Sequence, residues 1–196
     1  MIIKPTISHH GHINEVSMRN IMDSINKVVA LQAPTKSFDG ENKFQIEDGL
    51  YGAKIVAAKI SLDVETTFEG VTKKQNQLQL VYALDVNNGF GIASTVCSKK
   101  YNMVVNDKAS LVKTFAKVHP IAKLEDIQGL LGKSVQVLVS NVYNWANIAN
   151  VLPSKVGVKL AGKVYLPVFF KENSDKEMIS ATEDVEEGVF DYKSAK

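Results

Sequence analysis

The feature that most constrains the fold of this 196-residue chain is a long alternation of apolar and polar side chains that begins near position 50. In the stretch YGAKIVAAKISLDVETTF, every second residue from Val56 to Val64 is apolar, and the residues between them are mostly polar. A period of two is typical of a strand with one buried face. The phase slips before Val56, because Ile55 is apolar and Lys54 is polar, and such a slip predicts a bulge that bends the strand. The pattern therefore predicts a long, bent strand in a mainly β domain.

Four further strands and two helical segments are predicted after this strand. The strands are expected at 78–86, 90–101, 132–140 and 156–168. The sequence Asn87-Asn88-Gly89 favours a tight hairpin between the second and third strands. One helix, capped by Asn106 or Asp107, and a second over 124–131 that ends at Gly132 precede the fourth strand. This order predicts a five-stranded Greek-key barrel of the OB type, with a helical segment between strands three and four.

Two flanking segments are predicted to lie outside this barrel domain, which we place at 48–171. The N-terminal extension, 1–47, has an apolar stripe at helical spacing over 14–31. Residues 172–196 hold eight acidic residues and three lysines, a net charge of −5, whereas residues 1–171 carry +7. We therefore predict an acidic, disordered C-terminal tail. A basic body suggests a polyanionic partner, and such a tail can compete with that partner for the lysines.

The motif GLLGKS looks like the end of a phosphate-binding loop but does not have its spacing. The residue five positions before Gly132 is Ile127 rather than glycine, and the preceding segment has helical periodicity. Gly132 is therefore interpreted as a helix stop, and a nucleotide hydrolase is not predicted.

No enzymatic site is predicted elsewhere in the chain. The N-terminal histidines have no cysteine or carboxylate cluster nearby that would complete a tetrahedral metal site; they are His9, His10 and His12. No nucleophile elbow, pair of catalytic carboxylates or dinucleotide fingerprint is present. We therefore expect no catalysis, no metal and no cofactor.

The single cysteine, Cys97, excludes an internal disulfide and fits a reducing compartment. Its position in a predicted strand favours a small packing residue over a nucleophile. No apolar run approaches the about 20 residues of a membrane span, and the N-terminus lacks the apolar core of a signal peptide. A cytoplasmic protein is therefore expected.

Three stretches resemble the OB-fold single-stranded DNA-binding proteins that bacteriophages encode: YGAKIVAAKISLDVETTFEG, QLQLVYALD and LEDIQGLLGKSVQVLVS. The resemblance covers about residues 48–170 and lies in the order and spacing of elements. It implies sequence-tolerant binding of single-stranded DNA during replication, recombination or repair, inside a bacterial host. It also implies recruitment of replication proteins by the acidic tail, although this chain ends in Lys193-Ser-Ala-Lys196 and not in an apolar or aromatic residue.

Sequence-tolerant binding of a single strand requires cations for the phosphates and flat rings for the bases. OB folds bind on strands two and three and through the loops after strands one and four. The candidates are Lys73, Lys74 and Phe68 in or near the loop after the first strand, Lys99, Lys100 and Tyr101 at the end of the third, Tyr143 and Trp145 in the loop after the fourth, and Lys155, Lys159 and Lys163 in or near the fifth strand. Tyr82 is assigned to the core because it shares a phase with Leu80 and Leu84. The only arginine is Arg19, which argues against base-specific reading by bidentate contacts.

Two other functions remain open from the sequence. A viral structural or assembly protein, or another protein–protein interaction module, can use the same small barrel, and it would then fail to bind nucleic acid at low salt. A nuclease would need a metal site and would cleave in a magnesium-dependent manner.

Overall fold

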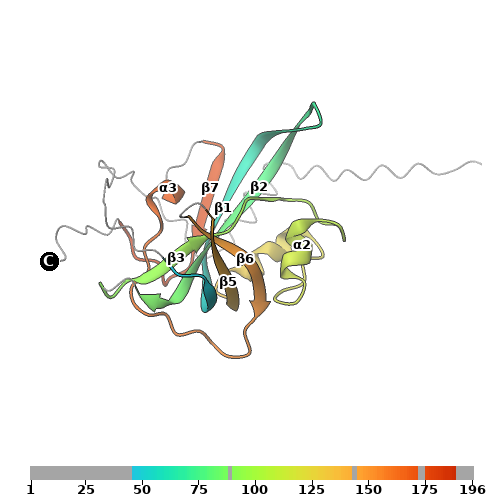
Figure 1. Cartoon of the computed structure of the whole chain (residues 1–196). Helices are drawn as coiled ribbons and strands as arrows, with labels where there is room; N and C mark the ends of the chain where they lie inside the picture. Colours follow the sequence, from blue (N-terminus) through green and yellow to red (C-terminus); the bar gives the residue numbers. More distant parts are fainter. Residues whose placement is uncertain (1–45, 88–89, 143–144, 172–174, 189–196) are drawn as a thin grey trace, which may run out of the picture.

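The computed structural model describes residues 46–87, 90–142, 145–171 and 175–188. Within these residues seven strands form one antiparallel sheet with the path β3-β2-β1-β5-β6, to which β4 adds beside β2 and β7 beside β1 (Figure 1). The strands are β1 Gly49–Phe68, β2 Val71–Asn87, β3 Ala93–Cys97, β4 Tyr101–Asn102, β5 Ser134–Val142, β6 Trp145–Pro153 and β7 Glu177–Ala181. The helical elements are α2 Ser110–Phe115, the 3₁₀ helix η1 Leu124–Leu130 and α3 Val168–Lys171.

The prediction of a mainly β domain is confirmed, but the sheet has seven strands instead of the predicted five and is not a closed barrel. The two ends of the path, β3 and β6, approach each other but share no ladder pairs among the described residues, so the sheet is open there. A helical segment does lie between the third and fourth predicted strands, as α2 and η1. Gly132 follows η1 with a φ of +77°, which agrees with its predicted role as a helix stop. The predicted N-terminal helix at 14–31 lies outside the described residues.

The bend predicted in β1 is confirmed, and it divides one edge of the strand between two partners. Residues Gly49 to Lys54 pair with β5, and residues Ala57 to Ser61 pair with β7 on the same edge. The register with β2 shifts between Ile55 and Ala57, where β1 passes from one neighbour to the other. The irregularity therefore lets a single strand serve two parts of the sheet.

Two hydrophobic clusters lie on opposite faces of the sheet. The main core contains Leu80, Tyr82 and Leu84 of β2, packed with Leu111 and Phe115 of α2. The second cluster contains the β2 residues between them, which meet a later part of the chain: Val81, Ala83, Val164, Leu166, Phe170 and Ile179. Successive side chains of a strand point to opposite faces. The core position predicted for Tyr82 is thus confirmed, and the other face of β2 is covered by residues from 164 onward.

Part of the predicted disordered tail is folded. Glu177–Ala181 forms β7, and Ile179 and Ala181 are buried in the second cluster. Beyond β7, Val185 forms an isolated bridge with Val164. This stretch therefore folds onto the sheet, because its few apolar residues are enough to complete an edge of β1. Residues 189–196 lie outside the described residues.

The predicted lysine-bearing loop after the first strand is instead a two-stranded ribbon that extends away from the body (Figure 1). β1 and β2 continue to Phe68 and Val71, and the chain turns at Glu69 and Gly70, whose φ values are 49° and 76°. The Thr67 and Thr72 hydroxyls lie 2.9 Å apart across the ribbon. Most side chains of the ribbon are polar, and its apolar Val71 is 55% exposed, because no core lies beside the turn.

The last predicted strand also differs from the structure. Residues 145–153, predicted as a loop, form β6 and pair with β5. Residues 156–168, predicted as a strand, contribute only two isolated bridges, at Lys163 and Val164, before α3 begins. Val164 and Leu166 of this segment are buried by lying over a face of the sheet rather than by pairing along an edge, whereas Val156 is exposed.

Candidate nucleic-acid interface

Lys99 and Lys100 are presented by an interruption between β3 and β4. The Ser98 hydroxyl accepts a hydrogen bond from the backbone N–H of Leu80 at 3.0 Å, in the place of a ladder carbonyl. The Ser98 carbonyl instead accepts from the Gln79 side chain at 3.0 Å. The chain leaves the ladder for two residues and rejoins β2 when Tyr101 pairs with Leu78. Both lysines are exposed as a result.

Tyr101 supports this site from within the core. Its side chain is only 3% exposed, and its ring packs edge-on against Phe115 with the centroids 5.8 Å apart. The Lys99 ammonium lies 5.4 Å from the centroid of the Tyr101 ring, within the range of a cation–π contact. Burial raises the pKa of the Tyr101 hydroxyl. In this structure the ring is therefore not exposed for stacking on a base, and its visible contacts position Lys99.

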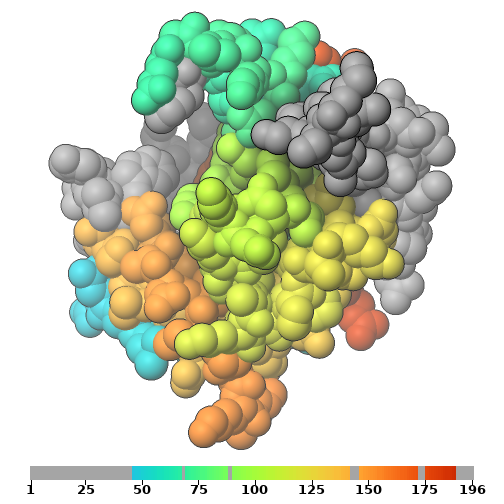
Figure 2. Space-filling model, turned by 90° about the vertical axis from the view of Figure 1, so that its right-hand side faces the viewer, coloured from blue at the N-terminus to red at the C-terminus, as the bar shows by residue number. Residues whose placement is uncertain are grey.

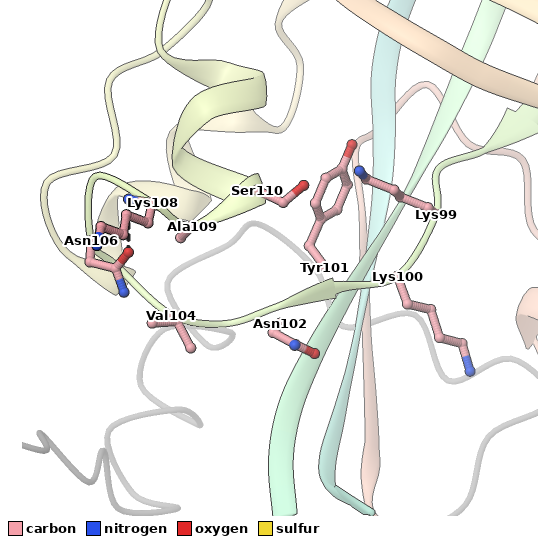
Figure 3. Close-up of a pocket in the computed structure, with 9 residues that line it drawn as sticks. All are labelled: Lys99, Lys100, Tyr101, Asn102, Val104, Asn106, Lys108, Ala109 and Ser110. Atoms are coloured by element: carbon pink, nitrogen blue, oxygen red, sulfur yellow. Dashed lines mark hydrogen bonds between the residues drawn. The ribbon is translucent and has the colours of Figure 1, made fainter. Parts of the chain in front are cut away.

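A hollow of about 430 Å³ opens between this interruption and the start of α2 (Figure 3). Its lining residues are Lys99, Lys100, Tyr101, Asn102, Val104, Asn106, Lys108, Ala109 and Ser110. Figure 3 shows that Ser110 points toward Tyr101, whereas Lys108 lies across the hollow from Lys99. The lining contains three cations and no carboxylate, so the hollow favours an anion.

A short turn places Lys108 on the far wall of the hollow. The Asn106 side-chain oxygen accepts a hydrogen bond from the Lys108 backbone N–H at 2.9 Å, and the Ala109 N–H donates to the Asn106 carbonyl at 3.0 Å. The residue at the N-cap of α2 is Ala109, with no side-chain cap. The prediction that Asn106 or Asp107 caps the helix is therefore wrong, because Asn106 organises the turn before it.

Five exposed lysines of segment 99–117 form no ion pair with any residue that the structure describes: Lys99, Lys100, Lys108, Lys113 and Lys117. The same segment contains one acidic residue, Asp107. Figure 2 shows this segment, green to yellow-green, at the centre of one face, below the tip of the ribbon. We call these five residues the lysine face.

Lysines on the opposite side of β1 have a different environment, because carboxylates of the C-terminal segment contact them. Lys54 Nζ lies 2.7 Å from Asp184, Lys59 Nζ lies 3.0 Å from Glu177, and Lys163 Nζ lies 3.6 Å from Glu186. Lys59 is buried, and its ammonium also lies 5.9 Å from the Phe170 ring centroid. The Lys171 ammonium donates to the Gly188 carbonyl, and burial lowers the pKa of Lys171. These lysines bind the folded acidic segment.

The remaining candidates from the sequence are spread over the molecule. Lys73 and Lys74 are exposed on the ribbon, where Lys74 lies 3.8 Å from Glu65. Lys155 and Lys159 are exposed in the irregular segment after β6, and Lys163 pairs with Glu186. The structure thus brings Lys99 and Lys100 together with Tyr101 and leaves these lysines elsewhere.

Three aromatic candidates lie wholly or in part outside the described residues. The backbones of Phe68 and Trp145 are placed, at the end of β1 and the start of β6, but their side chains lie outside the description. Tyr143 lies outside the described residues altogether. Their roles therefore stay predictions.

Sequence reasoning missed four polar residues of the hollow as site residues: Asn102, Asn106, Lys108 and Ser110. The helical spacing of Leu111, Phe115 and Val118 predicts only that Lys108 faces outward. A weak indication was present in the charge distribution, because residues 86–123 contain six lysines and one acidic residue.

The described residues offer little support for a reactive cysteine or a metal site. The predicted packing role of Cys97 agrees with its position in β3 beside the second cluster, where burial raises the pKa of its thiol to about 12. In the part of the chain that the structure describes, no three or more histidine, cysteine or acidic side chains gather into a metal-binding group, and His9, His10 and His12 lie outside it. The helices described are all too short or too polar to cross a membrane.

No family model, curated protein or solved structure matches the chain.

Proposed function

We propose that this protein binds single-stranded DNA without sequence preference, and that it protects the strand during replication, recombination or repair. The observation that carries the proposal is the lysine face, where five exposed cations lie on one segment and no described carboxylate pairs with them. Cations in this state can exchange their counterions for phosphates, which is the main source of affinity for nucleic acid.

The arrangement of the sheet supports a single strand as the ligand. An antiparallel sheet whose end strands approach each other is compatible with a partly open barrel of the OB type, a fold that binds oligonucleotides. Such a barrel would bind here at the side of β4 and α2, because the second cluster covers the outer face of β2 and β3. The cations are lysines, which suit backbone attraction better than base recognition.

A titration of the full chain with labelled oligo(dT), oligo(U) and a duplex of the same length tests this proposal. Fluorescence anisotropy at several salt concentrations should show much tighter binding of oligo(dT) than of the duplex, and the affinity should fall steeply as salt rises. Equal binding to the duplex would contradict a single-strand function. Absence of binding at low salt would instead favour a protein–protein interaction module.

A further inference from the structure

We propose that the hollow between β4 and α2 is the subsite that holds one nucleotide unit of the strand. Its lysines would contact the phosphate, and its uncharged wall would contact the attached sugar or base. The inference rests on the proposed function, since it names the part of the lysine face that grips the ligand.

The cations of the hollow come from two separate pieces of chain. Lys99 and Lys100 follow the interruption after Ser98, and Lys108 comes from the turn that Asn106 closes. Figure 3 shows the side chains of Lys99 and Lys108 on opposite sides of the opening. A group bound between them would therefore lie between cations from two segments, which one exposed lysine on a helix surface cannot provide.

Size and polarity favour a nucleotide over a bare phosphate ion. The volume of about 430 Å³ lies in the range of about 300–1,000 Å³ that is usual for small-molecule sites. Val104, which is 43% exposed, and Ala109 give the lining an uncharged part. Asn102 and Ser110 add neutral hydrogen-bonding groups. The shared chemistry is therefore a phosphate attached to a less polar group, which either a DNA strand or a free nucleotide offers.

Two lysine variants separate the hollow from the general charge of the face. Lys108→Ala removes a cation that lines the hollow, and Lys117→Ala removes an exposed cation of the same segment that does not. In oligo(dT) titrations, Lys108→Ala should flatten the plot of log affinity against log salt by about 0.7, the loss of one phosphate contact on a single strand. Lys117→Ala should change this slope by less than half as much. Equal urea midpoints for the two variants would establish that both are folded.

An NMR titration of the isotope-labelled full chain locates the bound unit directly. Thymidine 5′-monophosphate should shift the amide signals of residues 99–110, inorganic phosphate should shift the same signals less, and oligo(dT) should displace the nucleotide. Equal slope changes in the two variants, or shifts confined to another region, would overturn the subsite while leaving single-strand binding intact. A nucleotide that oligo(dT) cannot displace would show a site for free nucleotides and would also overturn it. Failure of oligo(dT) to bind the unmodified protein would overturn the proposed function itself.

Discussion

The two lysine-bearing sides of this sheet differ in what neutralises them. On the side of β7, the chain supplies its own carboxylates, and Lys54 and Lys59 lie within 3.0 Å of Asp184 and Glu177. On the lysine face, no described carboxylate pairs with the five cations. A lysine-rich sequence therefore contains two kinds of cation, one engaged in folding and one open to an external anion. Net charge alone does not separate them.

The acidic segment has a structural role on the side of β7. The sequence suggested a tail that competes with nucleic acid for lysines, but residues 177–181 pair with β1 and bury apolar side chains. Removing this segment would expose the second cluster, so the effect of its deletion on binding cannot be separated from its effect on folding. Point substitutions are the sharper tools.

The largest effect is expected at Phe170, which is fully buried under the C-terminal segment. Phe170→Ala should lower the free energy of unfolding by about 3–5 kcal/mol, because it leaves a cavity in the second cluster. The neighbouring Phe169 is 54% exposed, and Phe169→Ala should change stability by less than about 0.5 kcal/mol. Urea denaturation of both variants measures the difference. A loss below about 1 kcal/mol for Phe170→Ala would show that this side is a loose cover and not a core.

The next effect tests whether the paired lysines depend on their carboxylates. Glu177→Gln should cost about 1–3 kcal/mol of stability, because it removes the negative charge that lies 3.0 Å from the buried ammonium of Lys59. The control is Glu65→Gln on the ribbon, where Lys74 and Glu65 have side chains 64% and 66% exposed, and its effect should stay below about 0.5 kcal/mol. Equal urea midpoints for the two variants would remove the energetic distinction between the sides.

A smaller effect, on binding, is expected from two single variants, each of which removes one lysine from one of the two sides. Lys100→Ala should flatten the salt dependence of oligo(dT) binding by about 0.7 in slope, or about threefold in affinity between about 50 and 200 mM salt. Lys163→Ala should leave the slope nearly unchanged, because Glu186 already lies 3.6 Å from that ammonium. Anisotropy titrations decide between them. A larger loss for Lys163 would move the interface to the side of β7.

The smallest effect concerns Asp126, a carboxylate that accepts hydrogen bonds from two backbone N–H groups. The donors are the backbone N–H groups of Lys123 at 3.0 Å and Ala122 at 2.8 Å, and these bonds lower the pKa of Asp126 from the ordinary value of 3.8. Because the pKa is lower in the folded state, the ionised carboxylate stabilises the protein at pH values above the ordinary pKa of 3.8. This stabilisation is lost as the pH falls through the lowered pKa of the folded state.

Asp126→Asn should therefore be less stable than the parent protein near neutral pH, and the difference should shrink as the pH falls below 3.8. Urea midpoints from about pH 6 to about pH 2 test this, with Asp107→Asn, at an exposed position, as the control. A difference that is constant with pH would assign the effect to shape rather than charge.

The sequence predicted β1 because its two faces differ in polarity from Ala58 to Asp63. Ala58, Ile60 and Leu62 recur with a period of two because they meet the main core, and the bulge near Val56 follows from the slip in that period. The pattern is less informative where most side chains are polar, as in the ribbon around Glu69. It misleads where apolar residues lie over a face, as in residues 156–168.

The candidate site was only partly predictable for a related reason. The sequence predicts Lys99 and Lys100 from their place at the end of the third strand, but their presentation depends on Ser98 replacing a ladder carbonyl with its hydroxyl. Lys108 reaches the same hollow through a turn, and no sequence spacing encodes the distance between two such irregular segments. The stretch before residue 151 hid β6 because its asparagines recur at every third position, 141, 144, 147 and 150, and not at every second position as in a half-buried strand.

The pairing of β7 with β1 has a consequence for how the protein is made. Ser61 on β1 and Glu177 on β7 are hydrogen-bonded partners separated by 116 positions. During synthesis, β1 leaves the ribosome long before β7, so the edge at residues 57–61 stays unpaired while the intervening strands emerge. An exposed strand edge invites pairing with other chains, and contacts between distant residues form slowly. We expect the nascent chain to be prone to aggregation and to chaperone binding until Ala181 has left the ribosome and β7 can pair with β1.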